Sequence, residues 1–165
     1  MTKITITSNL PQAIAAFDRA PEVMLSAIGD RLHRGAKELA RHIRTNTAPK
    51  GATSTLTHSI RDIVVGPAHF GVVAGVEYAA FVHEGTGPGG YPSIPTIRDW
   101  IRLKGIRAHD GDERALPYRI RRSIGRKGIK ANPFMQRGLE EKTDRLRQLL
   151  DEGAALGLQR LGEMT

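Results

Sequence analysis

Residues 78–106, YAAFVHEGTGPGGYPSIPTIRDWIRLKGI, contain the densest cluster of glycine and proline in the chain. Four glycines and three prolines fall within residues 85–95. Glycine permits a positive φ, and proline fixes φ and lacks an N–H donor, so this stretch is neither helix nor strand. We expect a flexible loop over residues 85–95, shaped by the apolar segment before it and by a helix after it.

The helix after this loop is predicted over Thr96–Lys104. Thr96 is its expected N-cap, Asp99 is at the third helical position, and Gly105 is a suitable residue to end it. Trp100, the only tryptophan of the chain, is expected to anchor the helix against a sheet. It shares a helical face with Ile97, Ile101 and Lys104.

The N-terminal half begins with KITIT at residues 3–7, which alternates as a short strand does. One or two helical turns are expected over Pro11–Phe17, and a strong helix is expected to start at Pro21. Its apolar residues recur every three or four positions, as on one helical face. They are Leu25, Ile28, Leu32, Ala36, Leu39 and Ile43. The composition of residues 46–54 indicates a second flexible loop.

A hairpin follows, with strands predicted at Leu56–Val65 and Phe70–Val76 and a turn at residues 66–69. Ile60 and Val64 are its candidate core residues. Residues 78–84 read as either a strand or a short helix, because seven residues are too few for periodicity to decide.

The C-terminal part is predicted to be helical. One helix begins at Pro117 and ends at Gly128, and Asn132 caps a second with Pro133 in its first turn. The apolar residues of the second helix are Met135, Leu139, Leu146, Leu149 and Leu150. The second helix is predicted to continue to about Leu161, although Gly153 and Gly157 weaken its end. A loose tail over residues 153–165 is the alternative. The fold class is therefore α+β, with a small, mostly antiparallel sheet packed on a long N-terminal helix.

The length of 165 residues suits a single domain with its own core. Cysteine is absent, which excludes disulfides and thiolate metal sites. No apolar run is long enough to cross a membrane, and MTKITITSNL does not resemble a signal peptide. These features predict assembly in a cytoplasm.

The net charge of +8 is concentrated in one segment. Residues 98–130 hold eleven lysines and arginines against four acidic residues, and residues 114–130 hold no acid. Such a segment is expected to contact an acidic protein surface or, without reading sequence, nucleic-acid phosphates. The predicted basic contact patch comprises Arg114, Arg119, Arg121, Arg122, Arg126, Lys127 and Lys130.

Catalytic chemistry has little support in the sequence. His83 and Glu84 are adjacent, and no HExxH spacing is present. Glu84 is instead expected to hydrogen-bond the glycine-loop backbone. Residues 110–113 lack the spacing of a calcium loop, and residues 85–90 are no phosphate-binding loop. We expect no enzyme activity, no metal and no cofactor; a hydrolase using His83 and Glu84 is the weakest hypothesis.

The order of three motifs resembles a known family. YAAFVHEGTGP at residues 78–88 is followed by a proline-rich link and by IRDWIRLKGI at residues 97–106. LTHSI at residues 56–60 and GIKANPF at residues 128–134 fit the same pattern. Together these segments resemble the tail components of tailed phages, the family that includes the lambda minor tail protein Z and related tail-completion proteins. The matching motif residues include Tyr78, Phe81, Glu84, Gly85, Thr86, Gly87 and Trp100.

The resemblance implies a structural virion protein that completes the tail and joins head to tail at the neck. Its expected partners are a tail terminator, a tail-tube protein or a head connector. It also implies self-association, with a hexameric ring as one candidate. The alternative is a small basic protein that binds DNA without sequence specificity. DNA contact and membrane contact are not favoured.

Overall fold

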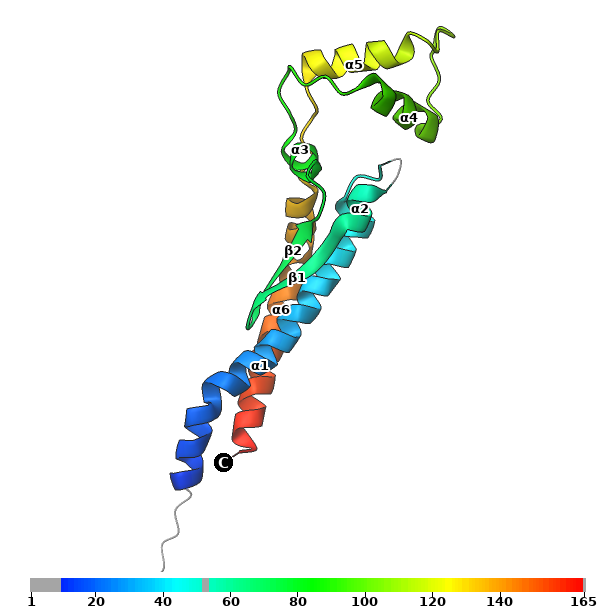
Figure 1. Ribbon diagram of the computed structural model, residues 1–165. Coiled ribbons are helices and arrows are strands. Elements are labelled where there is room, and N and C mark those ends of the chain that lie inside the picture. The colour runs from blue at the N-terminus through cyan, green and yellow to red at the C-terminus, as the bar shows by residue number, and fades with distance from the viewer. Residues whose placement is uncertain (1–9, 52–53, 165) are drawn as a thin grey trace, which may run out of the picture. The chain divides into compact units, whose positions relative to one another are not determined.

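The computed structural model describes residues 10–51 and 54–164 (Figure 1). It is mainly helical with a two-stranded antiparallel sheet, so the predicted α+β class is confirmed. The elements in order are α1 (Leu10–His42), η1 (Ile43–Thr47), α2 (Thr55–Ser59), β1 (Ile60–Gly66), β2 (His69–Ala74), α3 (Ala79–Glu84), α4 (Ile94–Lys104), α5 (Leu116–Lys127) and α6 (Phe134–Gly162). The strand predicted at residues 3–7 lies outside the described residues.

The chain forms two compact units. The first combines described residues up to Ala40 with Asp62–Val72 and those from Glu141 on. The second combines Arg41–Arg61 with Val73–Glu140. The expectation of a single domain stays a prediction. None of the described helices is both long and apolar enough to cross a membrane.

Helix α1 starts earlier than predicted. It begins at Leu10 and includes Pro21, so the separate turns and the start at Pro21 were wrong. Proline removes one backbone hydrogen bond, and here the turns on both sides continue the helix past it. The predicted stripe is buried at Ala36 and Ile43, whereas Leu25 is 49% exposed.

In the first unit, α6 packs closely against α1. A Cβ on Gly153 would lie 2.9 Å from Ile28 Cα, and one on Gly157 would overlap Met24 Sδ. These glycines therefore allow close helix approach, and α6 continues to Gly162. The predicted continuation of this helix to about Leu161 is therefore confirmed, and the alternative of a loose tail is wrong for the part that the structure describes.

Ion pairs link the same two helices. Arg145 Nε lies 3.4 Å from Glu38 Oε2, and Arg31 Nη1 lies 4.0 Å from Glu152 Oε2. The pKa of Glu38 is lowered, first by the hydrogen bond from Arg34 and also by the one from Arg145. Partly exposed pairs of this kind stabilise a fold only modestly.

The β-hairpin also contacts α1 in the first unit. The His33 ring stacks on Phe70 with 4.8 Å between ring centres, and His33 Nε2 lies 3.3 Å from Asp62 Oδ2. Strand β2 agrees with the predicted Phe70–Val76 to within two residues at its end.

The predicted first strand was wrong over its first residues, because Thr55–Ser59 forms helix α2. Thr57 Oγ1 donates to Ser54 O at 2.7 Å, and Ser59 Oγ donates to Leu56 O at 2.8 Å. Such local side-chain bonds favour a turn over a strand.

Of the two predicted core residues of β1, Ile60 is fully buried. Val64 is 65% exposed, so its predicted core position was wrong. Two-stranded ribbons twist strongly, so one face does not stay buried along the strand.

Phe134, at the start of α6, is the largest fully buried side chain of the second unit. Its ring meets the edge of His83 at 5.3 Å, and its carbonyl accepts a hydrogen bond of 2.8 Å from Thr47 Oγ1. Thr47 belongs to η1, so the loop predicted over residues 46–54 was wrong for its first two residues.

The expected cap of α6 differs as well. The helix begins at Phe134, after Pro133, and Asn132 Oδ1 accepts from Arg137 at 2.6 Å.

Candidate functional site

The motif segment 78–88 and the segment 128–134 meet in the second unit. Thr86 N donates to Ile129 O at 2.9 Å, and Ile129 N donates to Thr86 O at 3.1 Å. This antiparallel bridge joins residues 43 positions apart. Asn132 N adds a bond of 3.1 Å to Val82 O. We call this pairing the Thr86–Ile129 bridge.

Each of the two bridging residues directly follows a glycine that ends a helix. Gly85 ends α3 with φ 79° and ψ −178°, and Gly128 ends α5 with φ 71° and ψ −165°. This backbone region is essentially restricted to glycine. A Cβ on Gly85 would lie 2.6 Å from Ile129 O, and one on Gly128 would overlap Thr86 O. The two glycines therefore allow both the turn and the close approach.

The other motif residues are mostly at the surface. Residues 79–84 form helix α3, which settles the open choice between strand and helix. Tyr78 is 43% exposed and Phe81 59% exposed. Glu84 is exposed and makes no hydrogen bond to the glycine loop within the described residues, so its predicted role was wrong. That loop is held instead by backbone bonds, including Gly89 N to Gly125 O at 2.8 Å.

Helix α4 packs on α5 (Figure 1). Ser93, not Thr96, is its N-cap, because Ser93 Oγ accepts from Thr96 N at 3.3 Å. Asp99 therefore does not hold the third helical position. Gly105 ends α4 with φ 63°, as predicted.

Trp100 does not anchor α4 against the sheet, so that prediction was wrong. Ile97 is the buried residue of α4, and Trp100 is 41% exposed. Trp100 lies on an apolar surface with residues of α5 and of the preceding loop. That surface is formed by Pro92, Thr96, Ile97, Trp100, Ile120 and Ile124. The helical period correctly placed Ile97 with Trp100, but Ile101, which was expected on the same face, lines a different groove.

The predicted basic patch divides into four environments. Arg119 pairs with Asp110 and, at 3.6 Å, with Asp112. Arg121 Nε donates to Pro92 O at 3.2 Å, and its guanidinium carbon lies 5.3 Å from the Tyr91 ring centre. Both arginines therefore stabilise loops.

The remaining patch residues are exposed at the surface of the second unit. Three of them line a depression of about 460 Å³ on α5 and have no carboxylate partner within the described residues. They are Arg122, Arg126 and Lys127. Lys130 is exposed after α5, and Arg114 lines a different groove.

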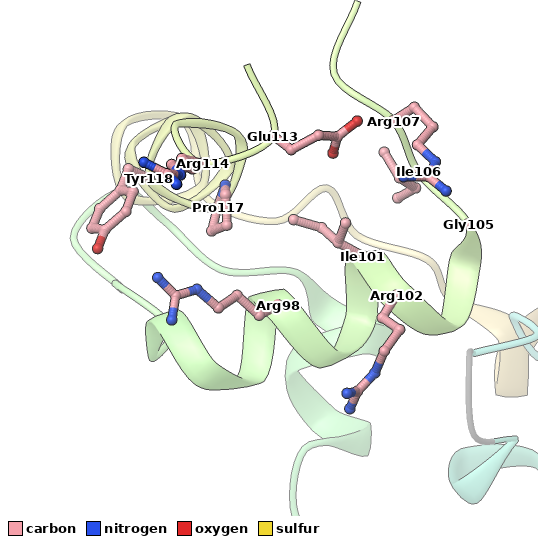
Figure 2. A pocket seen from close by; sticks show the side chains of 10 residues that line it. All are labelled: Arg98, Ile101, Arg102, Gly105, Ile106, Arg107, Glu113, Arg114, Pro117 and Tyr118. Atoms are coloured by element: carbon pink, nitrogen blue, oxygen red, sulfur yellow. The ribbon is translucent and has the colours of Figure 1, made fainter. Parts of the chain in front are cut away.

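This second groove has a volume of about 720 Å³ (Figure 2). It lies between α4 and the chain leading into α5. Arg98, Arg102 and Arg107 line it in addition to Arg114. The first three were missed as site residues, although the charge count over residues 98–130 contained them.

The acidic loop before α5 is occupied by its own hydrogen bonds. Asp110 Oδ1 accepts from Asp112 N at 3.2 Å, Asp112 Oδ1 from Ala115 N at 3.1 Å, and Glu113 Oε1 from Ala108 N at 3.1 Å. Within residues 10–51 and 54–164, no cluster of three or more His, Asp or Glu side chains suits a metal. His83 Nδ1 is buried without a partner, and its ring contacts Phe134.

No protein-family model, curated protein or solved structure matches this chain significantly.

The ion pair between Asp110 and Arg119 can be tested by its pH dependence. The pKa of Asp110 lies below its usual range because Arg119 donates a hydrogen bond to its carboxylate, with a further bond from Asp112 N. A carboxyl whose pKa falls on folding stabilises the fold above its unfolded pKa, and this contribution is lost as the pH falls through the folded value. We expect Asp110 to keep its bond to Arg119 below the ordinary aspartate pKa and to release it only as the pH falls through its lowered folded pKa.

Carbon-detected NMR titration of the Asp110 carboxyl measures this directly. The substitution Arg119→Gln is expected to raise the Asp110 pKa toward its usual range, because only the bond from Asp112 N then remains. An unchanged titration midpoint in that variant would show that the pair does not cause the shift.

Proposed function

We propose that this chain is a structural virion protein of a tailed phage or prophage. It completes the tail and joins heads to tails at the neck, as part of a homo-oligomeric ring. The proposal rests on the order of the sequence motifs that resemble tail-completion proteins. It gives the protein a mechanical role without an active site, in the virion, after assembly in the host cytoplasm.

One observation carries the proposal. The two motif segments, 78–88 and 128–134, are far apart in sequence, yet they pair through the Thr86–Ile129 bridge. If the two motifs only formed separate local turns, they would not need to pair with each other. The segment between them presents helices α4 and α5, which carry most of the unpaired cationic side chains described above. We infer that the bridge holds this basic surface for contact with a neighbouring neck or tail protein.

Complementation of a particle that lacks this protein tests the proposal. The variant R122Q/R126Q/K127Q removes three exposed cations that have no carboxylate partner within the described residues. It is expected to fold, to fail to enter tails, and to leave filled heads unjoined, because its docking surface has lost its charge. Electron microscopy of the particles and the yield of infectious phage measure this effect.

The matched control is K37Q/R147Q/R160Q, which removes the same charge from exposed positions on α1 and α6. It is expected to give normal yields. If the α5 variant also joins heads to tails normally, its cations have no role in assembly. If purified tails contain no copy of the protein, the virion proposal itself fails.

Non-specific DNA binding is the second candidate, favoured by the same three cations. In that case the affinity for duplex DNA falls steeply with salt, with a log–log slope of about −0.9 for each neutralised phosphate. The α5 variant then flattens the slope by up to about three units. Weak binding at physiological salt, unchanged by the variant, would exclude this candidate.

A further inference from the structure

The groove between α4 and the start of α5 combines an apolar floor with a cationic rim. Ile101 and Ile106 contribute from the α4 side, and Pro117 and Tyr118 from α5 (Figure 2). Pro117 is buried, and Tyr118 is 53% exposed. The groove volume of about 720 Å³ lies within the range of roughly 300–1,000 Å³ that is typical of ligand sites.

The charge on the rim is strongly positive and largely unpaired. Arg98, Arg107 and Arg114 have no carboxylate partner within the described residues. Arg102 differs, because it pairs with Asp99 at 2.6 Å and points away from α5 (Figure 2). Three guanidinium groups are thus available to a ligand. Arginine binds carboxylates through two parallel hydrogen bonds, which a fixed groove can orient.

One acidic group narrows the choice of ligand. Glu113 also lines the groove, and its carboxylate is held there by the Ala108 N–H at 3.1 Å. A continuous phosphate backbone would pass close to this negative charge. A peptide avoids the repulsion, because its carboxylates are spaced along the chain and its N–H groups can face Glu113. The apolar floor likewise suits an aliphatic or aromatic side chain.

We propose that this groove binds a short acidic segment of a partner protein, anchored by one large apolar side chain. The carboxylates of the segment pair with Arg98, Arg107 and Arg114. The apolar side chain lies on Ile101, Ile106 and the Tyr118 ring. The proposal rests on the groove and its charges alone and does not depend on the virion role.

Fluorescence anisotropy with the full chain tests this inference. The probe is a labelled peptide of about ten residues, rich in glutamate with a central Phe-Leu pair, at about 0.15 M salt. The variant R98Q/R107Q/R114Q is expected to weaken binding at least about tenfold. The matched control K37Q/R147Q/R160Q removes the same charge elsewhere and is expected to change binding less than about threefold.

A separate variant tests the contribution of the apolar floor to peptide binding. Tyr118→Ser removes an exposed ring and is expected to weaken the peptide about threefold to tenfold, and replacing the Phe-Leu pair of the probe with serines should do the same. Thermal melting of each variant checks that the fold is kept.

Three results would overturn the proposal. The first is that the unmodified chain does not bind the peptide at up to about 1 mM. The second is an equal loss of binding in both triple variants, which would mean bulk charge attraction. The third is that a DNA duplex of about 20 base pairs binds more tightly than the peptide and that the groove variant abolishes this binding, which would assign the groove to nucleic acid.

Discussion

Phe134→Ala is expected to lower the free energy of unfolding by about 3–5 kcal/mol, a large part of the stability of a small protein. Phe134 is fully buried, packs edge-on to His83, and holds the start of α6 where Thr47 bonds its carbonyl. Removal of the ring leaves a cavity in the second unit. Urea unfolding followed by the fluorescence of Trp100, which belongs to the same unit, measures the loss.

Trp100→Ala is the contrasting variant. Because Trp100 is 41% exposed, its loss is expected to cost only about 1 kcal/mol. Circular dichroism measures the unfolding of both variants, because it does not need the Trp100 fluorescence that this variant lacks. If the two substitutions prove equally destabilising, Trp100 is a core residue after all and its surface position is wrong.

Gly128→Ala is expected to cost about 3 kcal/mol or more, because it combines backbone strain with a clash. Gly128 has a conformation that other residues avoid, and a Cβ there would overlap Thr86 O. Gly85→Ala should have a similar effect, since its Cβ would lie 2.6 Å from Ile129 O. The Thr86–Ile129 bridge would open in both variants, and amide hydrogen exchange at Thr86 and Ile129 would report it.

Two glycines serve as controls for strain and for clash. Gly105 also has a positive φ, but nothing lies within 4 Å of its added Cβ, so Gly105→Ala should cost about 1 kcal/mol. Gly90 has neither feature and should tolerate alanine. Equal losses at Gly105 and Gly128 would show that the clash contributes nothing.

The sequence predicted the helices best, because helical order is local and repeats every three or four residues. The extent of α5, the glycine at its end and the stop at Gly105 were all read correctly. The α+β class followed from the hairpin between helices. The strand predicted from Leu56 was wrong over α2, because the side chains of Thr57 and Ser59 hydrogen-bond backbone carbonyls there.

What the sequence could not show is which segments meet. Trp100 was placed against a sheet because a lone tryptophan usually fills a core, yet its helix packs on α5. The Thr86–Ile129 bridge has no periodic signature, since it joins single residues over a long separation. The groove arginines were visible as charge, but only the packing of α4 on α5 brings Arg98 and Arg114 together.

The Thr86–Ile129 bridge also bears on how this protein can diverge between relatives. It closes the chain at the base of the segment that carries α4 and α5, so that segment leaves and returns at one point. The entropy of closing such a segment rises only with the logarithm of its length, by about 0.6 kcal/mol for each doubling. Insertions, deletions and new charges beyond the bridge therefore add little cost to the core below it. The surface of α4 and α5 can therefore vary in sequence while the buried residues around Phe134 stay the same.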